Sequence, residues 1–455
     1  MTTPVFDFVK KYAKKNPLRL HMPGHKGRGV LGVEKYDITE IQGADSLFEA
    51  NGIIAESEKN LSEIFGTRAS FYSAEGSSLC IRAMLYLVMQ NAKHRRVLAG
   101  RNAHKSFLSA SALVDFEIDW IYGLDGSDLY TCRITPEYLR TCIDKGGGKY
   151  DAVYVTSPDY LGNMLDIGAL SEVCHEYGIP LVVDNAHGAY LKFFDMHPMQ
   201  LGADMCCDSA HKTLPVLTGG AYLHVSETCM YKYEENAKRA LSLFASTSPS
   251  YLILSSLDAA NKQLADEKFA KRIKNTEKVL RKLRKKLADM GYMLCSDEPM
   301  KLTVRTSKNG LTGTEMSEYL AKHGVVSEFC DKDNLTMMFP ISFSFFNPLS
   351  FLSFLYSFCF YFRLFFLFSR CPLSHDGHSK NECHVFPPEK AVSVRSAMFS
   401  PCETVPVRES MGRILASPCV SCPPAIPIAV CGEIIDENAV RLFEYYGIDE
   451  ICVIK

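Results

Sequence analysis

The sequence has almost no net charge, which narrows the classes of partner it can bind. It carries 50 Lys and Arg residues against 52 Asp and Glu, a formal charge of −2. Proteins that bind polyanions concentrate cationic side chains, so we expect no nucleic-acid partner. The N-terminal stretch MTTPVFDFVKKYAKKN lacks the apolar run of a signal peptide. We therefore expect a cytoplasmic protein whose 17 cysteines are mostly reduced and buried.

The spacing of cysteine and histidine lacks a recognisable metal-binding pattern. The pairs Cys206/Cys207 and Cys419/Cys422 each stand without the second ligand pair that a zinc site of four ligands needs. The stretch CPLSHDGHSKNECH, residues 371–384, holds five Cys and His residues, but their spacing does not match a zinc finger. We expect no metal site.

One long apolar run differs from the rest of the sequence. Residues 342–370, SFSFFNPLSFLSFLYSFCFYFRLFFLFSR, consist almost wholly of Phe, Ser, Leu, Tyr and Cys. The run from Leu349 to Phe368 is long enough to span a bilayer, but Arg363 lies inside it and Pro348 at its start. These residue types share pyrimidine-rich codons, as a shifted reading frame would produce. We interpret residues 341–384 as a tolerated insertion or a reading-frame artefact, with a membrane span as the alternative.

From about residue 55 to 245, apolar runs of strand length alternate with amphipathic segments of helix length. Strands buried on both faces have this composition, and intervening helices make such strands parallel or mixed. The expected strands are Arg96–Ala99, Ile118–Ile121, Ala152–Thr156, Pro180–Asp184, Met205–Asp208 and Ala221–Val225. The sequence thus predicts an α/β fold with a mixed, mostly parallel sheet between helices.

The length of 455 residues exceeds the size at which one core stops growing, so we expect more than one domain. Helical patterns cover Val5–Tyr12 and, with many cations, residues 255–292. The predicted division is an N-terminal segment over 1–60, a large domain over 61–255, the start of a smaller α/β domain over 256–340, the aberrant stretch 341–384 and a C-terminal domain over 385–455.

The stretch CCDSAHKTLPVLTGG, residues 206–220, places Lys212 just after a predicted strand. Ligands of open α/β sheets bind at the carboxyl ends of the strands. A lysine held rigidly there can form a Schiff base with an aldehyde cofactor, although a lysine in a turn is more simply a surface cation. Asp184 ends the preceding strand, and a buried carboxylate needs a cationic partner, such as a protonated pyridine nitrogen. The two residues on successive strands favour the cofactor over a structural ion pair.

Two further stretches extend this candidate cofactor site. Gly76–Ser78 precedes an apolar helical stretch, and helix N-terminal amides with two hydroxyls suit a phosphate, although the same pattern also caps helices. His104, in GRNAHKSF, follows a short strand, where it can stack on a cofactor ring, handle protons or be purely structural.

Together these stretches resemble the fold-type I pyridoxal phosphate enzymes, and specifically the Orn/Lys/Arg decarboxylase family in its shorter form. The resemblance covers about residues 15–340 and 385–455, and its most specific combination is HMPGHK with SAHKTLP and STSPSY. It implies a large cofactor-binding domain with a smaller C-terminal α/β domain, pyridoxal 5'-phosphate as cofactor, and decarboxylation of arginine, lysine or ornithine to the corresponding amine. It also implies a homodimer or a higher homo-oligomer.

The resemblance implies roles for individual residues. Lys212, His104, Asp184 and His211 would form the catalytic set, with Lys212 holding the cofactor and Asp184 pairing with its ring nitrogen. His104 would stack on one face of the ring and Ala186 on the other. The phosphate would contact Ser77, Ser78, Ser209 and His211, and Glu433 would lie near the distal cation of the substrate.

The sequence departs from the family pattern near its end. Cys422, Ala425 and Cys431 stand where a more usual member has Tyr, Gly and Pro. The alternatives are another enzyme on the same fold, such as an aminotransferase or a cysteine desulfurase, and a degenerate relative without catalysis. Which basic amino acid is used, the size of the oligomer and any effector site are left open by the sequence.

Overall fold

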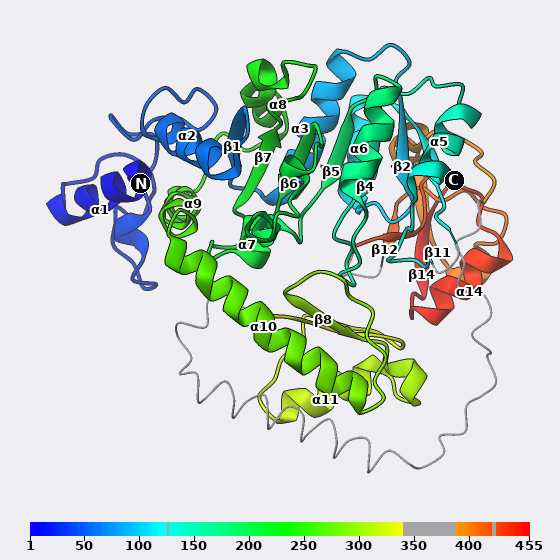
Figure 1. The fold of residues 1–455 in the computed structure, drawn as a ribbon. Helices are drawn as coiled ribbons and strands as arrows, with labels where there is room; N and C mark the ends of the chain where they lie inside the picture. Colours follow the sequence, from blue (N-terminus) through cyan, green and yellow to red (C-terminus); the bar gives the residue numbers. More distant parts are fainter. Residues whose placement is uncertain (125–126, 340–387, 421–424) are drawn as a thin grey trace. The chain divides into compact units, whose positions relative to one another are not determined.

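The computed structural model describes residues 1–124, 127–339, 388–420 and 425–455 (Figure 1). The aberrant stretch 341–384, its Cys and His cluster and Cys422 lie outside the described residues. Within them, one compact unit comprises residues 1–157, 165–266 and 388–455, and a second comprises 158–164 and 267–339. No helix among the described residues is long and apolar enough to cross a membrane.

A seven-stranded sheet forms the centre of the first unit. Strand β7 runs antiparallel to both of its neighbours, and strands β2 to β6 run parallel to one another. The mixed, mostly parallel sheet expected from the sequence is therefore confirmed. The strands follow one another across the sheet in the order β1 (Ala69–Ser73), β7 (Ala221–Val225), β6 (Met205–Asp208), β5 (Leu181–Asp184), β4 (Ala152–Thr156), β2 (Arg96–Gly100) and β3 (Glu117–Ile121).

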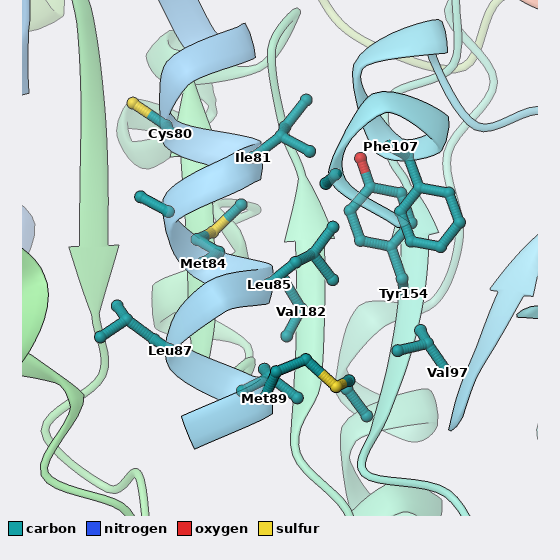
Figure 2. Close-up of a cluster of buried hydrophobic side chains, with 14 of the residues drawn as sticks. Cys80, Ile81, Met84, Leu85, Leu87, Met89, Val97, Phe107, Tyr154 and Val182 are labelled. Atoms are coloured by element: carbon teal, nitrogen blue, oxygen red, sulfur yellow. The ribbon is translucent and has the colours of Figure 1, made fainter. Parts of the chain in front are cut away.

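Both faces of the sheet are covered by helices, which explains the largely apolar composition of the central strands. Alternate residues of one strand enter different clusters, so that Tyr154 packs on one face and Val153 on the other. Figure 2 shows the first face, where Leu85 lies near Val182 and the ring of Phe107 stacks on Tyr154 with centroids 4.3 Å apart. This face packs against α3 (Gly76–Gln90), α4 (Lys105–Val114) and α8 (Ala237–Phe244), and the other against α5 (Pro136–Lys145) and α6 (Ile167–Glu176).

Apolar periodicity in the sequence predicts the first helix of the chain correctly but misses a break between two later helices. The expected N-terminal helix is α1 (Pro4–Lys15), followed by α2 (Ile53–Phe65). The basic pattern over 255–292 is not one helix but two, α9 (Tyr251–Leu264) and α10 (Glu267–Asp289). The Asp266 N–H donates to the Gln263 carbonyl in a tight turn that ends α9, and the boundary between the two units falls at this residue.

The second unit has a small antiparallel sheet of its own. Its strand order is β8 (Lys301–Val304), β10 (Leu335–Met338) and β9 (Phe329–Cys330). Helices α10 and α11 (Gly313–Lys322) belong to the same unit. On α10 the apolar residues, such as Phe269, Ile273 and Leu280, are buried, whereas most of its cations are exposed.

The chain after residue 388 belongs to the first unit. Its α13 (Val394–Phe399) packs against α4, where the Arg395 guanidinium donates to the Ala112 carbonyl at 2.5 Å. Its strands form two antiparallel pairs, β11 (Cys402–Pro406) with β14 (Glu450–Ile454), and β12 (Cys419–Val420) with β13 (Pro427–Ala429), and α14 (Glu437–Tyr445) precedes the last strand.

Candidate active site

The candidate site residues gather where the parallel strands end. In the register of the sheet, Thr156 of β4 lies beside Asp184 of β5, and Asp184 lies beside Cys207 of β6. Lys212 follows β6 and lies on the short helix α7 (Ala210–Thr213). Its backbone N–H donates to the Ser209 carbonyl at 2.9 Å. Lys212 is exposed, as a lysine that receives a cofactor has to be.

The amine of Lys212 has a histidine partner. Its Nζ lies 3.1 Å from Nε2 of His187, a buried residue in the turn after β5. Gly188 is required in this turn, because a Cβ atom there would lie 2.0 Å from Oδ1 of Asn185. A hydrogen bond between an amine and an imidazole lets either group carry the proton.

Asp184 is a buried carboxylate with only partial compensation inside the protein. Burial raises its pKa, whereas the charge of Lys212 and hydrogen bonds to the carboxylate oppose that rise. The Ala186 N–H donates to Oδ1 at 3.1 Å and the Tyr154 hydroxyl to Oδ2 at 3.2 Å. A cation beside Asp184 would favour its ionised form.

Gly76, Ser77 and Ser78 form the first turn of α3. Gly76 has a positive φ of 74°, which favours glycine, and a Cβ atom there would meet no atom within 4 Å. The Ser209 hydroxyl donates to Ser77 Oγ and the Ser106 hydroxyl to Ser78 Oγ, each at 2.7 Å. The space beside Gly76 is thus open, and the amides of this helix turn together with the serine hydroxyls can hold an anion such as phosphate.

Both predicted histidines have a pKa below the ordinary value of histidine. Burial, followed by the charge of Lys212, lowers the pKa of His104 to about 4, and its Nδ1 accepts the Ser106 N–H at 3.1 Å. Burial also lowers the pKa of His211, whose Nδ1 lies 2.9 Å from the Gly220 carbonyl oxygen. Both rings are thus held in one orientation by the backbone.

These residues fit pyridoxal phosphate. An aldehyde, a ring nitrogen and a phosphate need an amine, an acid and an anion site, respectively. The described residues offer Lys212, Asp184 and the open space beside Gly76 in one part of the first unit.

Glu433 lies in a different setting from the other predicted site residues. It is 4% exposed, its Oε2 accepts the Val430 N–H at 2.6 Å, and Nη2 of Arg101 lies 3.9 Å away. Burial raises the pKa of Glu433, and Arg101 opposes that rise. Arg101 also donates to the Pro427 and Ile428 carbonyls, each at 2.9 Å. The carboxylate therefore already has a cationic partner within the chain.

Ala425 illustrates the departure from the family pattern noted above. It has a φ of 60°, in the left-handed region, where glycine is at no disadvantage and alanine is strained. Its carbonyl accepts the Lys105 N–H at 3.0 Å, next to His104.

His187 is a contact of Lys212 that the sequence analysis did not single out. The signal was present in DNAHGAY, three residues after Asp184, but a single histidine after a strand is usually structural. Only the distance to Lys212 distinguishes it.

Comparison with known proteins assigns the chain to a family. The model of the Orn/Lys/Arg decarboxylase major domain matches residues 3–297, and that of the C-terminal domain of the same family matches residues 378–450. Arginine decarboxylase of Bacillus subtilis is 28% identical, over 97% of this chain and 93% of its own length. Its counterpart in Halalkalibacterium halodurans is 29% identical, over 96% and 91%. The crystal structure of a Francisella novicida lysine decarboxylase, 18% identical, has the same fold, with a TM-score of 0.78 over 100% of this chain and 81% of that one. This chain therefore belongs to the Orn/Lys/Arg decarboxylase family.

Proposed function

We propose that this chain decarboxylates a basic amino acid with pyridoxal phosphate bound through Lys212. The observation that carries the proposal is the position of the Lys212 amine, 3.1 Å from His187 and within electrostatic range of the buried Asp184 carboxylate. Family membership supports both the reaction and the cofactor.

Each described group has a task in the proposal. Bound pyridoxal phosphate supplies an aldehyde that captures amines and a pyridinium ring that withdraws electrons from the α-carbon of the substrate. Lys212 would bind the aldehyde, and Asp184 would keep the ring nitrogen protonated. His104 and Ala186 would contact the ring, and Ser77, Ser78, Ser209 and His211 would hold the phosphate.

Loss of carbon dioxide requires a proton at the α-carbon of the product. We assign that proton to Nζ of Lys212, which can regain it from His187 across their hydrogen bond. His104 is less suited to this task, because its low pKa keeps it neutral at physiological pH.

Glu433 is our proposed partner for the distal cation of the substrate. Arg101 already offsets part of its charge, so a guanidinium or ammonium group would bind in competition with Arg101. Relatives named arginine decarboxylase make arginine the first substrate to test, followed by lysine and ornithine.

We also propose a cytoplasmic homodimer or higher homo-oligomer. Leu18, Leu20, Val30 and Leu31 are all at least 78% exposed in the single chain, and covering such an apolar surface favours self-association. The 12 cysteines whose side chains the structure describes are free thiols, which supports a reducing compartment.

The test is release of carbon dioxide by purified protein loaded with the cofactor. We expect release from at least one of arginine, lysine and ornithine, and none from Lys212→Ala. Lys232→Ala, which changes an exposed lysine paired with Glu235, is the matched control and retains activity. Formation of a keto acid or sulfide without carbon dioxide would instead identify an aminotransferase or a desulfurase, and no product at all would leave a degenerate relative.

A further inference from the structure

Four fully buried polar residues form a network behind the candidate site. Asp208 ends β6, Asn185 follows β5, His224 lies on β7, and His197 precedes a short 3-10 helix over Pro198–Gln200; each is 0% exposed. Nothing in the proposed reaction uses these side chains. Polar groups this deeply buried are costly unless they are fully hydrogen-bonded.

Asp208 is the centre of the network. Its Oδ2 lies 3.0 Å from Nε2 of His197 and 3.3 Å from Nε2 of His224, and its Oδ1 accepts the Asn185 Nδ2–H at 2.6 Å. Burial alone would raise the pKa of Asp208, but the two histidines hold this pKa well below its usual range. Asp208 is therefore an ionised carboxylate that accepts three hydrogen bonds.

Two histidines and one carboxylate this close together also suit a metal ion. The tautomer of His197 argues against that assignment. The Met199 N–H donates to Nδ1 of His197 at 3.3 Å, so Nδ1 carries the lone pair and Nε2 carries the proton that faces Asp208. To bind a metal through Nε2, His197 would need the lone pair on Nε2 and the proton on Nδ1, which is the opposite arrangement.

The link from Asp208 to Asn185 leads directly to the candidate site. The Asn185 N–H donates to the Cys207 carbonyl at 3.0 Å, and its own carbonyl accepts the Gly188 N–H at 2.8 Å. Asn185 thereby fixes the turn whose next two residues are Ala186, which donates to Asp184, and His187, which contacts Lys212. On its other side Asp208 adjoins Ser209, whose hydroxyl donates to Ser77.

We propose that Asp208 is a positioning residue, which acts through Asn185 to hold the turn over residues 185–188 and Ser209 in the geometry that binds the cofactor. This inference rests on the proposed function, because it assumes that pyridoxal phosphate occupies the space between these two segments. Because Asp208 is fully buried, we assign its side chain no direct contact with the cofactor or the substrate.

The first test separates positioning from general stability. Asn185→Ala removes the link, and Ser70→Ala is the matched control, because Ser70 Oγ lies 2.7 Å from His224 Nδ1 at a different end of the network. We expect both variants to lower the thermal midpoint of the cofactor-free protein to a similar degree. Asn185→Ala should also raise the Kd for pyridoxal phosphate at least tenfold and weaken the visible circular dichroism of the bound cofactor, whereas Ser70→Ala keeps the Kd within twofold.

An exchange of the two side chains tests the link even if Asn185→Ala does not fold. Asn185→Asp alone places two carboxylates face to face and should weaken cofactor binding. Adding Asp208→Asn restores one amide and one carboxylate with their positions swapped, and should return the Kd to within about threefold of the unmodified protein.

Three results would overturn the inference. These are an unchanged Kd in Asn185→Ala, no recovery in the exchanged pair, and one tightly bound zinc per chain that Asp208→Asn loses. Unmodified protein that takes up no pyridoxal phosphate would overturn this inference and the proposed function together. Protein that binds the cofactor but releases no carbon dioxide would overturn only the proposed reaction, since the readouts here are cofactor affinity and circular dichroism.

Discussion

The Nζ atom of Lys212 lies 3.1 Å from Nε2 of His187, and this contact joins two strand ends that are 25 residues apart in the chain. His187 is buried, whereas Lys212 is exposed. The histidine therefore presents a fixed partner to a lysine that substrate and cofactor can reach. When Lys212 loses a proton, His187 can accept it. When Lys212 donates a proton to another group, His187 can replace that proton.

Replacing His187 by Asn should slow the reaction more than it weakens the cofactor. Asn keeps a polar side chain but cannot exchange a proton, and removal of a general acid or base typically costs about 100-fold or more in rate. We expect kcat for carbon dioxide release to fall by about that factor, with the visible absorbance of the bound cofactor retained. A kcat within threefold of the unmodified protein would mean that His187 only fills space.

The Asp184→Asn variant should still bind the cofactor, but it should release carbon dioxide very slowly. The substitution keeps the shape of the side chain and removes the charge that would pair with the ring nitrogen. Breaking a buried ion pair costs about 3 kcal/mol or more, which corresponds to a rate lower by about 100-fold. Single-turnover carbon dioxide release and cofactor content measured on the same sample provide the check. Equal losses of cofactor and activity would point to a role in binding alone.

The sheet was predictable from the sequence because its central strands are buried on both faces. Each expected strand lies within one residue of its observed bounds at either end, as in Ala152–Thr156 and Met205–Asp208. The edge strand Ala69–Ser73 was not expected, since its composition is mixed and it pairs on one side only, with β7. The break between α9 and α10 was missed because the apolar periodicity continues across it.

The candidate site was predictable only where one residue carries a distinctive chemistry. Lys212 and Asp184 each follow a strong apolar strand, so their position at the sheet edge could be inferred. The partners of Asp208 come from residues 185, 197 and 224, and no local pattern connects them. The ion pair of Glu433 with Arg101 likewise joins residues more than 300 positions apart.

Glu433→Gln separates substrate recognition from internal pairing. If the carboxylate binds the distal cation of the substrate, KM for arginine should rise at least tenfold while kcat changes little. The buried Arg101 would also lose its partner, so a lower thermal midpoint is expected in any case. Arg101→Met provides the comparison, because it lowers the midpoint without removing the carboxylate. An unchanged KM in Glu433→Gln would assign this residue to structure and not to the substrate.

Asp258, on α9, should make the stability of the protein depend on pH. Its Oδ2 accepts the Phe6 N–H at 2.9 Å at the start of α1, and its Oδ1 accepts the Ser57 hydroxyl. Burial raises the pKa of Asp258 to about 6 from the ordinary value of 3.8. The folded state therefore holds this proton more tightly than the unfolded state, and the stability gained from it is lost as pH rises through about 6.

The Asp258→Asn variant lacks the titrating carboxyl, so comparison with it separates the pH dependence of stability due to Asp258 from that due to other acidic residues. Between pH 4.5 and 7.5, the free energy of unfolding of the unmodified protein should fall relative to the variant by about 2 kcal/mol, since one pKa unit corresponds to about 1.4 kcal/mol. Urea unfolding of both proteins across this range measures the difference. Glu235→Gln, a change at an exposed carboxylate, should give a curve parallel to that of the unmodified protein. A parallel curve for Asp258→Asn as well would show that the Asp258 carboxyl titrates alike in the folded and unfolded states, and that the docking of α1 is insensitive to its charge.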